Sequence, residues 1–143
     1  MKPTERDRIR RNHWLAWMGL CAALAFHVAD EASTDFLGWY NPIARTLREK
    51  YPMLLLPVFR FDVWISLLIF AIVSLTAVSY IVWKGRWAMR PISHMFAGFM
   101  LLNGLLHMAI SFYFREWLPG VYSSPLLIAA SLLLIVYTRA WDR

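Results

Sequence analysis

Long apolar stretches constrain this chain more than any other feature of its sequence. They run over residues 61–83, 91–113 and 122–141, and each is close to the roughly 20 residues that an α-helix needs to cross a bilayer. A shorter apolar run over residues 14–29 precedes them and ends in charged residues. Hydrophobic residues make up 59% of the sequence and charged residues 17%, which is more apolar than a soluble domain. The sequence therefore predicts an integral membrane protein.

The spacing of the apolar stretches predicts the architecture. We expect one all-α membrane domain over residues 1–143, folded as a four-helix up-down bundle. The predicted transmembrane helices cover about residues 13–34, 61–83, 91–113 and 122–139. Asn41-Pro42 is typical of a helix start. It predicts a short interfacial helix over about residues 42–51, between the first two spans.

The net charge of +6 comes from basic residues at the ends of the apolar segments. They gather in residues 2–11, 84–90 and 139–143, rather than along one helical face, so a nucleic-acid partner is not expected. By the positive-inside rule this pattern places both termini in the cytoplasm of a multi-pass protein of the cell inner membrane. A cleavable signal peptide is the alternative for the first run, but that run ends in His, Asp and Glu rather than in a small-residue cleavage site.

Aromatic and histidine side chains near the segment ends are expected at the membrane interface. Trp14 and Trp17 lie at the start of the first span, where indole rings prefer the interface. His13 follows the basic cluster and is expected there too. His94 is rotated by about 140° from His107 on the third span. We therefore expect His94 near the cytoplasmic end, outside any site that contains His107.

Two groups of polar residues are predicted to meet at one depth. His27, Asp30 and Glu31 share a face of the first helix because they are three and four residues apart. Asn103 and His107, four residues apart, share a face of the third helix. In an alternating bundle these two helices run in the same direction. His107 lies about 24 Å along its helix from the predicted start, near the depth of His27. Both groups should therefore lie in the outer half of the bundle.

Such a cluster is costly in a membrane unless its members are partners or hold a ligand. His27, Glu31 and His107 are candidate ligands for a divalent metal such as zinc, iron or manganese. Asp30 and Glu31 are candidate catalytic carboxylates, and Asn103 and His107 are candidate ligand-binding residues. Three interpretations stay open: a metal site, metal-free acid–base chemistry or proton relay, and a structural polar plug that holds two helices together.

At these residues the sequence resembles the HXXEE family of small multi-pass prokaryotic membrane proteins. The motif stands here as HVADE over residues 27–31, with Asp in place of the first Glu. The stretch FLGWYNP, the Asn103 and His107 pair and the later Pro119-Gly120 segment are also similar, so the resemblance covers most of the chain. It implies a polar site shared by His27, Asp30, Glu31, Asn103 and His107, and no established activity. The shorter Asp makes Glu31 the stronger candidate for the indispensable acid.

The leading hypothesis is a metal-dependent enzyme that acts on a lipid or another apolar substrate. The alternative is a non-enzymatic membrane protein that binds a cationic ligand or relays protons through the same acidic pocket. A metal-free isomerase with paired acids is a third. The expected partners are membrane lipid and a small apolar or cationic ligand, and the sequence is compatible with a homo-oligomer. The sequence alone leaves open whether the chain is an enzyme.

Overall fold

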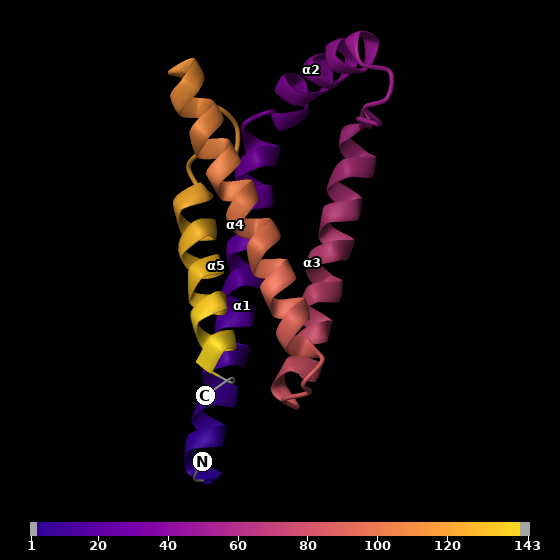
Figure 1. The fold of residues 1–143 in the computed structure, drawn as a ribbon. Coiled ribbons are helices and arrows are strands. Elements are labelled where there is room, and N and C mark those ends of the chain that lie inside the picture. The colour runs from indigo at the N-terminus through magenta and orange to yellow at the C-terminus, as the bar shows by residue number, and fades with distance from the viewer. Residues whose placement is uncertain (1–2, 141–143) are drawn as a thin grey trace.

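The structure is a computed structural model that describes residues 3–140, and all the regular secondary structure within this range is helical (Figure 1). The helices are α1 (Pro3–Ser33), α2 (Phe36–Lys50), α3 (Phe61–Trp83), α4 (Met89–Phe114) and α5 (Ser124–Arg139). The predicted all-α class is confirmed. The span predicted over residues 61–83 coincides with α3.

Three helices are long and apolar enough to cross a membrane: α1 over Glu5–Ser33, α3 and α4. Only 6% of the most apolar part of α3 is buried inside the protein, so its side chains need an apolar surrounding. The helix α5 is apolar but has only 16 residues. It is about 24 Å long, which is shorter than the hydrocarbon core of a bilayer. The sequence predicted four full spans. The described residues contain three helices long enough to span a membrane and one shorter apolar helix, α5.

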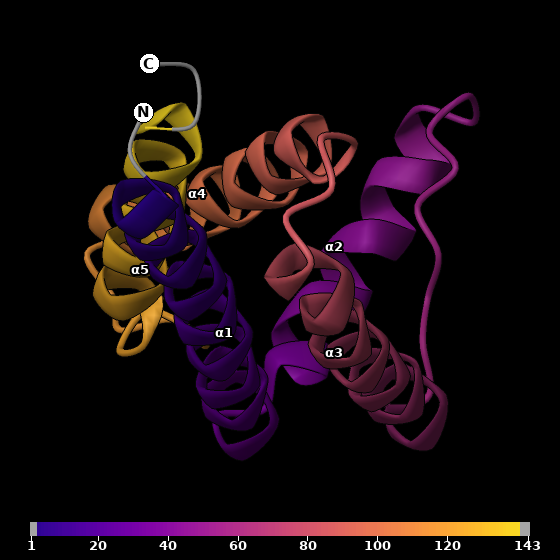
Figure 2. The same ribbon diagram turned by 90° about the horizontal axis from the view of Figure 1, so that it is seen from below.

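The helix α1 lies at the centre of the molecule, between α5 on one side and α3 on the other (Figure 2). The helix α4 packs mainly on α5, while α3 and α4 hardly touch each other. Gly104 allows the close approach of α4 to α5. A Cβ there would lie 2.8 Å from Cγ1 of Ile128 and 3.2 Å from the Ser124 carbonyl oxygen. Small residues at helix contacts are typical of membrane bundles.

Two residues expected at the interface are instead buried in the protein. Trp17 is fully buried, and its indole N–H donates to the Leu75 carbonyl at 3.0 Å. His13 is 2% exposed, with Nε2 at 2.9 Å from the Ser93 hydroxyl. The helix α1 begins ten residues before the predicted start at residue 13. Both side chains therefore lie within the packed part of the helix.

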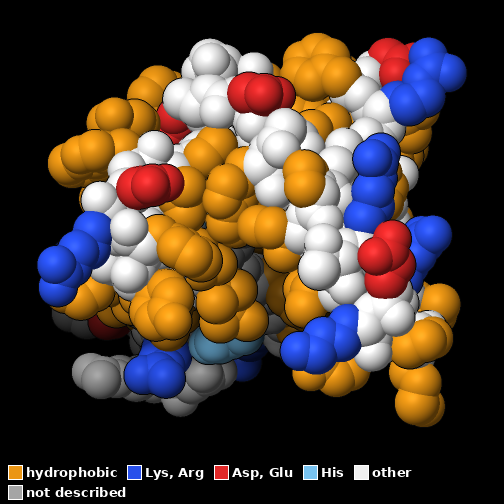
Figure 3. Space-filling model, turned by 90° about the horizontal axis from the view of Figure 1, so that it is seen from above, with side chains coloured by type: hydrophobic (Ala, Val, Ile, Leu, Met, Phe, Trp, Pro, Cys, Tyr) orange, Lys and Arg blue, Asp and Glu red, His pale blue; other side chains and the backbone are white. Residues whose placement is uncertain are grey.

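The helix α2 begins at Phe36, six residues before the predicted start. Asp35 adopts the left-handed conformation, with φ 55°, and its carboxylate accepts from the Gly38 N–H at 3.2 Å. A Cβ at Gly38 would overlap that carboxylate. Asn41 holds the backbone of Phe59 through two hydrogen bonds of 2.9 and 3.1 Å instead of capping a helix. Seen from above, charged side chains lie around the rim of this end and hydrophobic ones lie between them (Figure 3).

Candidate functional site

A non-helical segment before α5 builds one wall of the candidate site. Residues 115–123 leave the end of α4 and return along it, so that α5 starts at the level of Gly104 on α4. This return brings Pro119, Gly120 and Ser123 against α1 and α4. Irregular backbone at membrane depth is tolerated where it is buried in protein or lines a cavity. The helix α5 is short because residues 115–123 are not helical, and the polar residues gather beside this segment.

His27, Glu31 and His107 converge at this level. Nε2 of His107 lies 3.2 Å from Oε1 of Glu31, and Nε2 of His27 lies 3.7 Å from the same oxygen. One ligand atom from each of the three residues lies within 4.8 Å of the other two. His27 is fully buried and Glu31 is 7% exposed. The structure thus brings two imidazoles and one carboxylate into a space that water hardly reaches.

The partner of His107 fixes which of its nitrogens carries a proton. Nδ1 lies 2.7 Å from the Pro119 carbonyl oxygen, which only accepts hydrogen bonds. Nδ1 must therefore be the N–H donor. In the neutral ring, Nε2 then presents a lone pair to the Glu31 carboxylate. A backbone carbonyl on the other nitrogen is a common arrangement for metal-binding histidine.

The same holds for His27, through a relay that includes Asp30. The Ser123 hydroxyl donates to Oδ2 of Asp30 at 2.7 Å. The Gly120 carbonyl oxygen, at 3.2 Å, is also only an acceptor, so the hydroxyl hydrogen points to one of these two oxygens and not to His27. Nδ1 of His27, 2.8 Å from the Ser123 oxygen, must then be the donor. Its Nε2 is left as a lone pair that is buried and has no hydrogen-bond partner among residues 3–140.

Three electron-pair donors therefore face one another, from His27, Glu31 and His107. Buried polar groups in such an arrangement are costly unless a positive species lies between them. Either a metal ion or an added proton would supply the positive charge. The main chemical property of the site is therefore that it favours a bound cation.

Aromatic rings from α2 and α3 cover the site on its outer side. The Phe36 ring lies 5.9 Å from the His107 ring and stacks at 5.8 Å on Trp64 and 5.4 Å on Tyr40. These rings place apolar surface against the His107 side of the polar cluster. Phe36 carries no signal as a site residue in the sequence, since its position depends on the left-handed turn at Asp35.

The remaining predicted site residues lie at two other places. Asp30 is directed at the start of α5, where Oδ2 accepts from the Ser123 backbone N–H at 2.9 Å as well as from its hydroxyl. It contacts His27 only through Ser123. Asn103 lines a cavity beside His27 and Glu31, and its side chain makes no hydrogen bond within the described part of the chain. His94 lies well away, with Nδ1 3.0 Å from the Arg90 carbonyl.

Replacing Asp30 with alanine is expected to destabilise the chain by about 2 kcal/mol. The change removes a charged acceptor from the Ser123 N–H and hydroxyl, and charge-assisted hydrogen bonds contribute about 1.5–3 kcal/mol. The carboxylate also faces the positive end of the α5 dipole. Thermal unfolding in detergent should show a midpoint lower by about 4–8 °C. Asp62→Ala is the control, because the ion pair of Asp62 with Arg60 is exposed and its loss should shift the midpoint little.

Comparison with known proteins adds one finding. The model of a family described as "Protein of unknown function with HXXEE motif" matches residues 17–135, which is most of the chain. No curated protein and no solved structure matches it. The matched range includes α2, α3 and α4 entirely, and every residue of the site described above.

Proposed function

The chain belongs to the HXXEE family of proteins of unknown function, and we propose that it is a membrane protein that binds a divalent metal ion through His27, Glu31 and His107. In this proposal the metal site serves an enzyme that acts on a lipid or another apolar substrate within the membrane. The observation that carries it is the convergence of two imidazole lone pairs and one carboxylate in a buried space.

The distances from the Glu31 oxygen to the two imidazole nitrogens suit a metal. Two ligand atoms that are each about 2.1 Å from a tetrahedral zinc ion lie about 3.4 Å apart. The separations of the Glu31 oxygen from the two Nε2 atoms, 3.2 and 3.7 Å, bracket this value. Two histidines and one carboxylate form the ligand set of a catalytic site, in which a fourth position stays open for water or substrate. Iron and manganese also accept such ligands.

The residues around the ligands have defined tasks in this proposal. Pro119 and Ser123 hold the two rings with Nε2 inward, and Asp30 fixes the Ser123 hydroxyl that orients His27. Glu31 neutralises part of the metal charge. A metal bound there would polarise a substrate oxygen or a bound water. Phe36 limits the entry of bulk water from the outer side, which strengthens electrostatic interactions in the site.

We also propose a topology with four crossings. The helix α1 begins and α5 ends at the same end of the molecule (Figure 1). The returning segment 115–123 together with α5 would complete the fourth passage, with buried irregular backbone in place of additional helical turns. The basic residues at that end favour a cytoplasmic location for both termini in the inner membrane.

Metal analysis of the detergent-purified protein tests the proposal. The wild type is expected to retain about one equivalent of a divalent metal after dialysis, and His107→Ala is expected to retain almost none. His94→Ala is the matched control, because that ring hydrogen-bonds to its own helix and takes no part in the site. It should keep the metal.

A folded wild type that takes up no zinc, iron or manganese, even after incubation with each ion, would contradict the proposal. The specific alternative is a proton held between His107 and Glu31, which the 3.2 Å separation also allows. Such a protein would bind a cation or relay protons without metal. Its proton flux in vesicles would then depend on Glu31 and not on added metal.

A further inference from the structure

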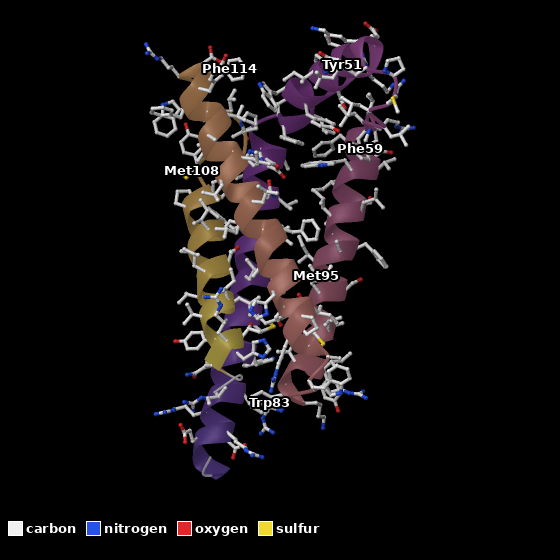
Figure 4. The ribbon with its side chains drawn as sticks, viewed as in Figure 1. Tyr51, Phe59, Trp83, Met95, Met108 and Phe114 are labelled. Carbon is white, nitrogen blue, oxygen red and sulfur yellow. The ribbon has the colours of Figure 1, made fainter. Side chains whose placement is uncertain are left out.

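An apolar cavity of about 480 Å³ adjoins the polar cluster and is lined by three helices. Its size lies within the range of small-molecule binding sites. Its apolar walls include Leu24 and Val28 of α1, Leu68 and Leu75 of α3, and Phe96 and Met100 of α4. The helices α3 and α4 hardly contact each other, so the cavity is open at the side between them. In Figure 4 the side chains of α3 and α4 face one another across this space.

The cavity has a polar end and an apolar end. Its polar lining residues, His27, Glu31 and Asn103, all lie at the outer end, towards the C-termini of α1 and α4. Leu24 lies seven residues before Glu31 on α1, and Phe96 lies seven residues before Asn103 on α4, which is about 10 Å along each helix. His27 lies between these levels, one turn after Leu24. This is the orientation of a membrane lipid, whose oxygen atoms lie near the interface and whose hydrocarbon chain lies inside.

The polar part of the cavity is small, which limits the size of the polar end of any ligand. It consists of three side chains, His27, Glu31 and Asn103, and every other lining residue is apolar. Asn103 offers both a donor and an acceptor to a small polar group, and its side chain makes no hydrogen bond within the described part of the chain. The adjoining cluster supplies the remaining polar contacts.

We infer that this cavity binds a single-chain lipid with a small, oxygen-bearing end, which enters sideways from the bilayer between α3 and α4. The oxygen lies at Asn103 beside the polar cluster, and the hydrocarbon chain lies against Leu24, Leu75 and Phe96. The inference deepens the proposed function, since it names the class of substrate for the same site. Binding of the hydrocarbon chain in the cavity does not itself require a metal.

Photolabelling in reconstituted vesicles tests the inference. The probe is a long-chain fatty alcohol that carries a diazirine near its middle, and labelled peptides are identified by mass spectrometry. Labelling of the cavity segment around Phe96 and Met100 is expected to saturate at a low mole fraction of probe. Labelling at Val73, which is 61% exposed on α3, should rise in proportion to the probe, as for any lipid-facing residue.

Two alanines of α3 provide matched variants. Ala71 lines the cavity, whereas Ala77 is exposed and does not. Ala71→Trp should reduce the saturable labelling at least tenfold, and Ala77→Trp should leave it unchanged. Ala71→Leu repeats the test with a smaller side chain and should reduce the labelling by a smaller factor.

Three results would overturn the inference: non-saturable labelling of the cavity segment, equal labelling in the two tryptophan variants, or saturable labelling by a diazirine phosphatidylcholine alone. The metal content of the same samples separates this inference from the proposed function. Ala71→Trp should keep its metal and lose the lipid, while His107→Ala should lose its metal and keep saturable labelling, because His107 does not line the cavity.

Discussion

Replacing Glu31 with glutamine is expected to abolish metal binding while leaving the chain at least as stable as the metal-free wild type. The amide keeps the shape of the side chain but removes the only negative charge among the three ligands. It also adds an N–H group, which can donate to the Nε2 lone pair of His107, 3.2 Å from the Glu31 oxygen. The buried site would then be neutral and better satisfied without a cation.

Thermal unfolding with and without a chelator measures this effect. A metal present at about 100 times its dissociation constant stabilises the folded state by about 2.7 kcal/mol. A chelator should therefore lower the unfolding midpoint of the wild type by about 5–10 °C. Glu31→Gln should show no response to the chelator, and its midpoint should match or exceed that of the chelated wild type.

The opposite pattern identifies the metal-free alternative. If a protonated His107 forms an ion pair with Glu31, the chelator has no effect on the wild type, and Glu31→Gln lowers the midpoint because it removes the buried counter-ion. Glu116→Gln is the control for the substitution itself. That carboxylate is exposed beyond the end of α4, so its midpoint and metal content should equal those of the wild type.

Helix periodicity was sufficient to predict that His27, Glu31 and His107 come together, although it placed Asp30 and Asn103 with them. His27 and His107 lie on helices that run in the same direction, and the fixed rise of the α-helix puts them at similar depths. The structure brings both rings to one carboxylate. The apolar length of residues 61–83 likewise predicted α3. Regular helices are predictable because each position depends mainly on local geometry.

Irregular backbone was not predictable in the same way. The turn signal at Pro119 and Gly120 indicated that the last helix begins after it, but nothing in the local pattern shows that residues 115–123 return along α4. The hydrogen bonds of this segment to His107 and Asp30 are long-range, so Ser123 carried no signal as a site residue. The Asn41-Pro42 signal failed for a related reason, because a left-handed turn at Asp35 started α2 earlier.

Gly120 ties the returning segment to the site, and Gly120→Ala is expected to damage both stability and metal binding. Its φ of +83° is strained for any residue with a side chain. An added Cβ would lie 2.7 Å from Nδ1 of His107 and 3.1 Å from Cε1 of His27. Neither ring can turn away freely, since Nδ1 of each is held by Pro119 or Ser123. The methyl group would therefore displace both rings or break those hydrogen bonds.

Gly85→Ala separates the effect of backbone strain from the effect of the collision with the histidine rings. Gly85 has a φ of +66° but lies in the connection between α3 and α4, at the other end of the molecule from the site. Alanine at either glycine is expected to cost about 1 kcal/mol or more in backbone strain. At Gly120 the collision should add about 1–3 kcal/mol and reduce the retained metal at least tenfold, whereas Gly85→Ala should keep the metal of the wild type. Equal metal content in the two variants would contradict this prediction. It would show that Gly120 is needed only for the backbone conformation of the turn, and that the space beside the two histidine rings does not affect metal binding.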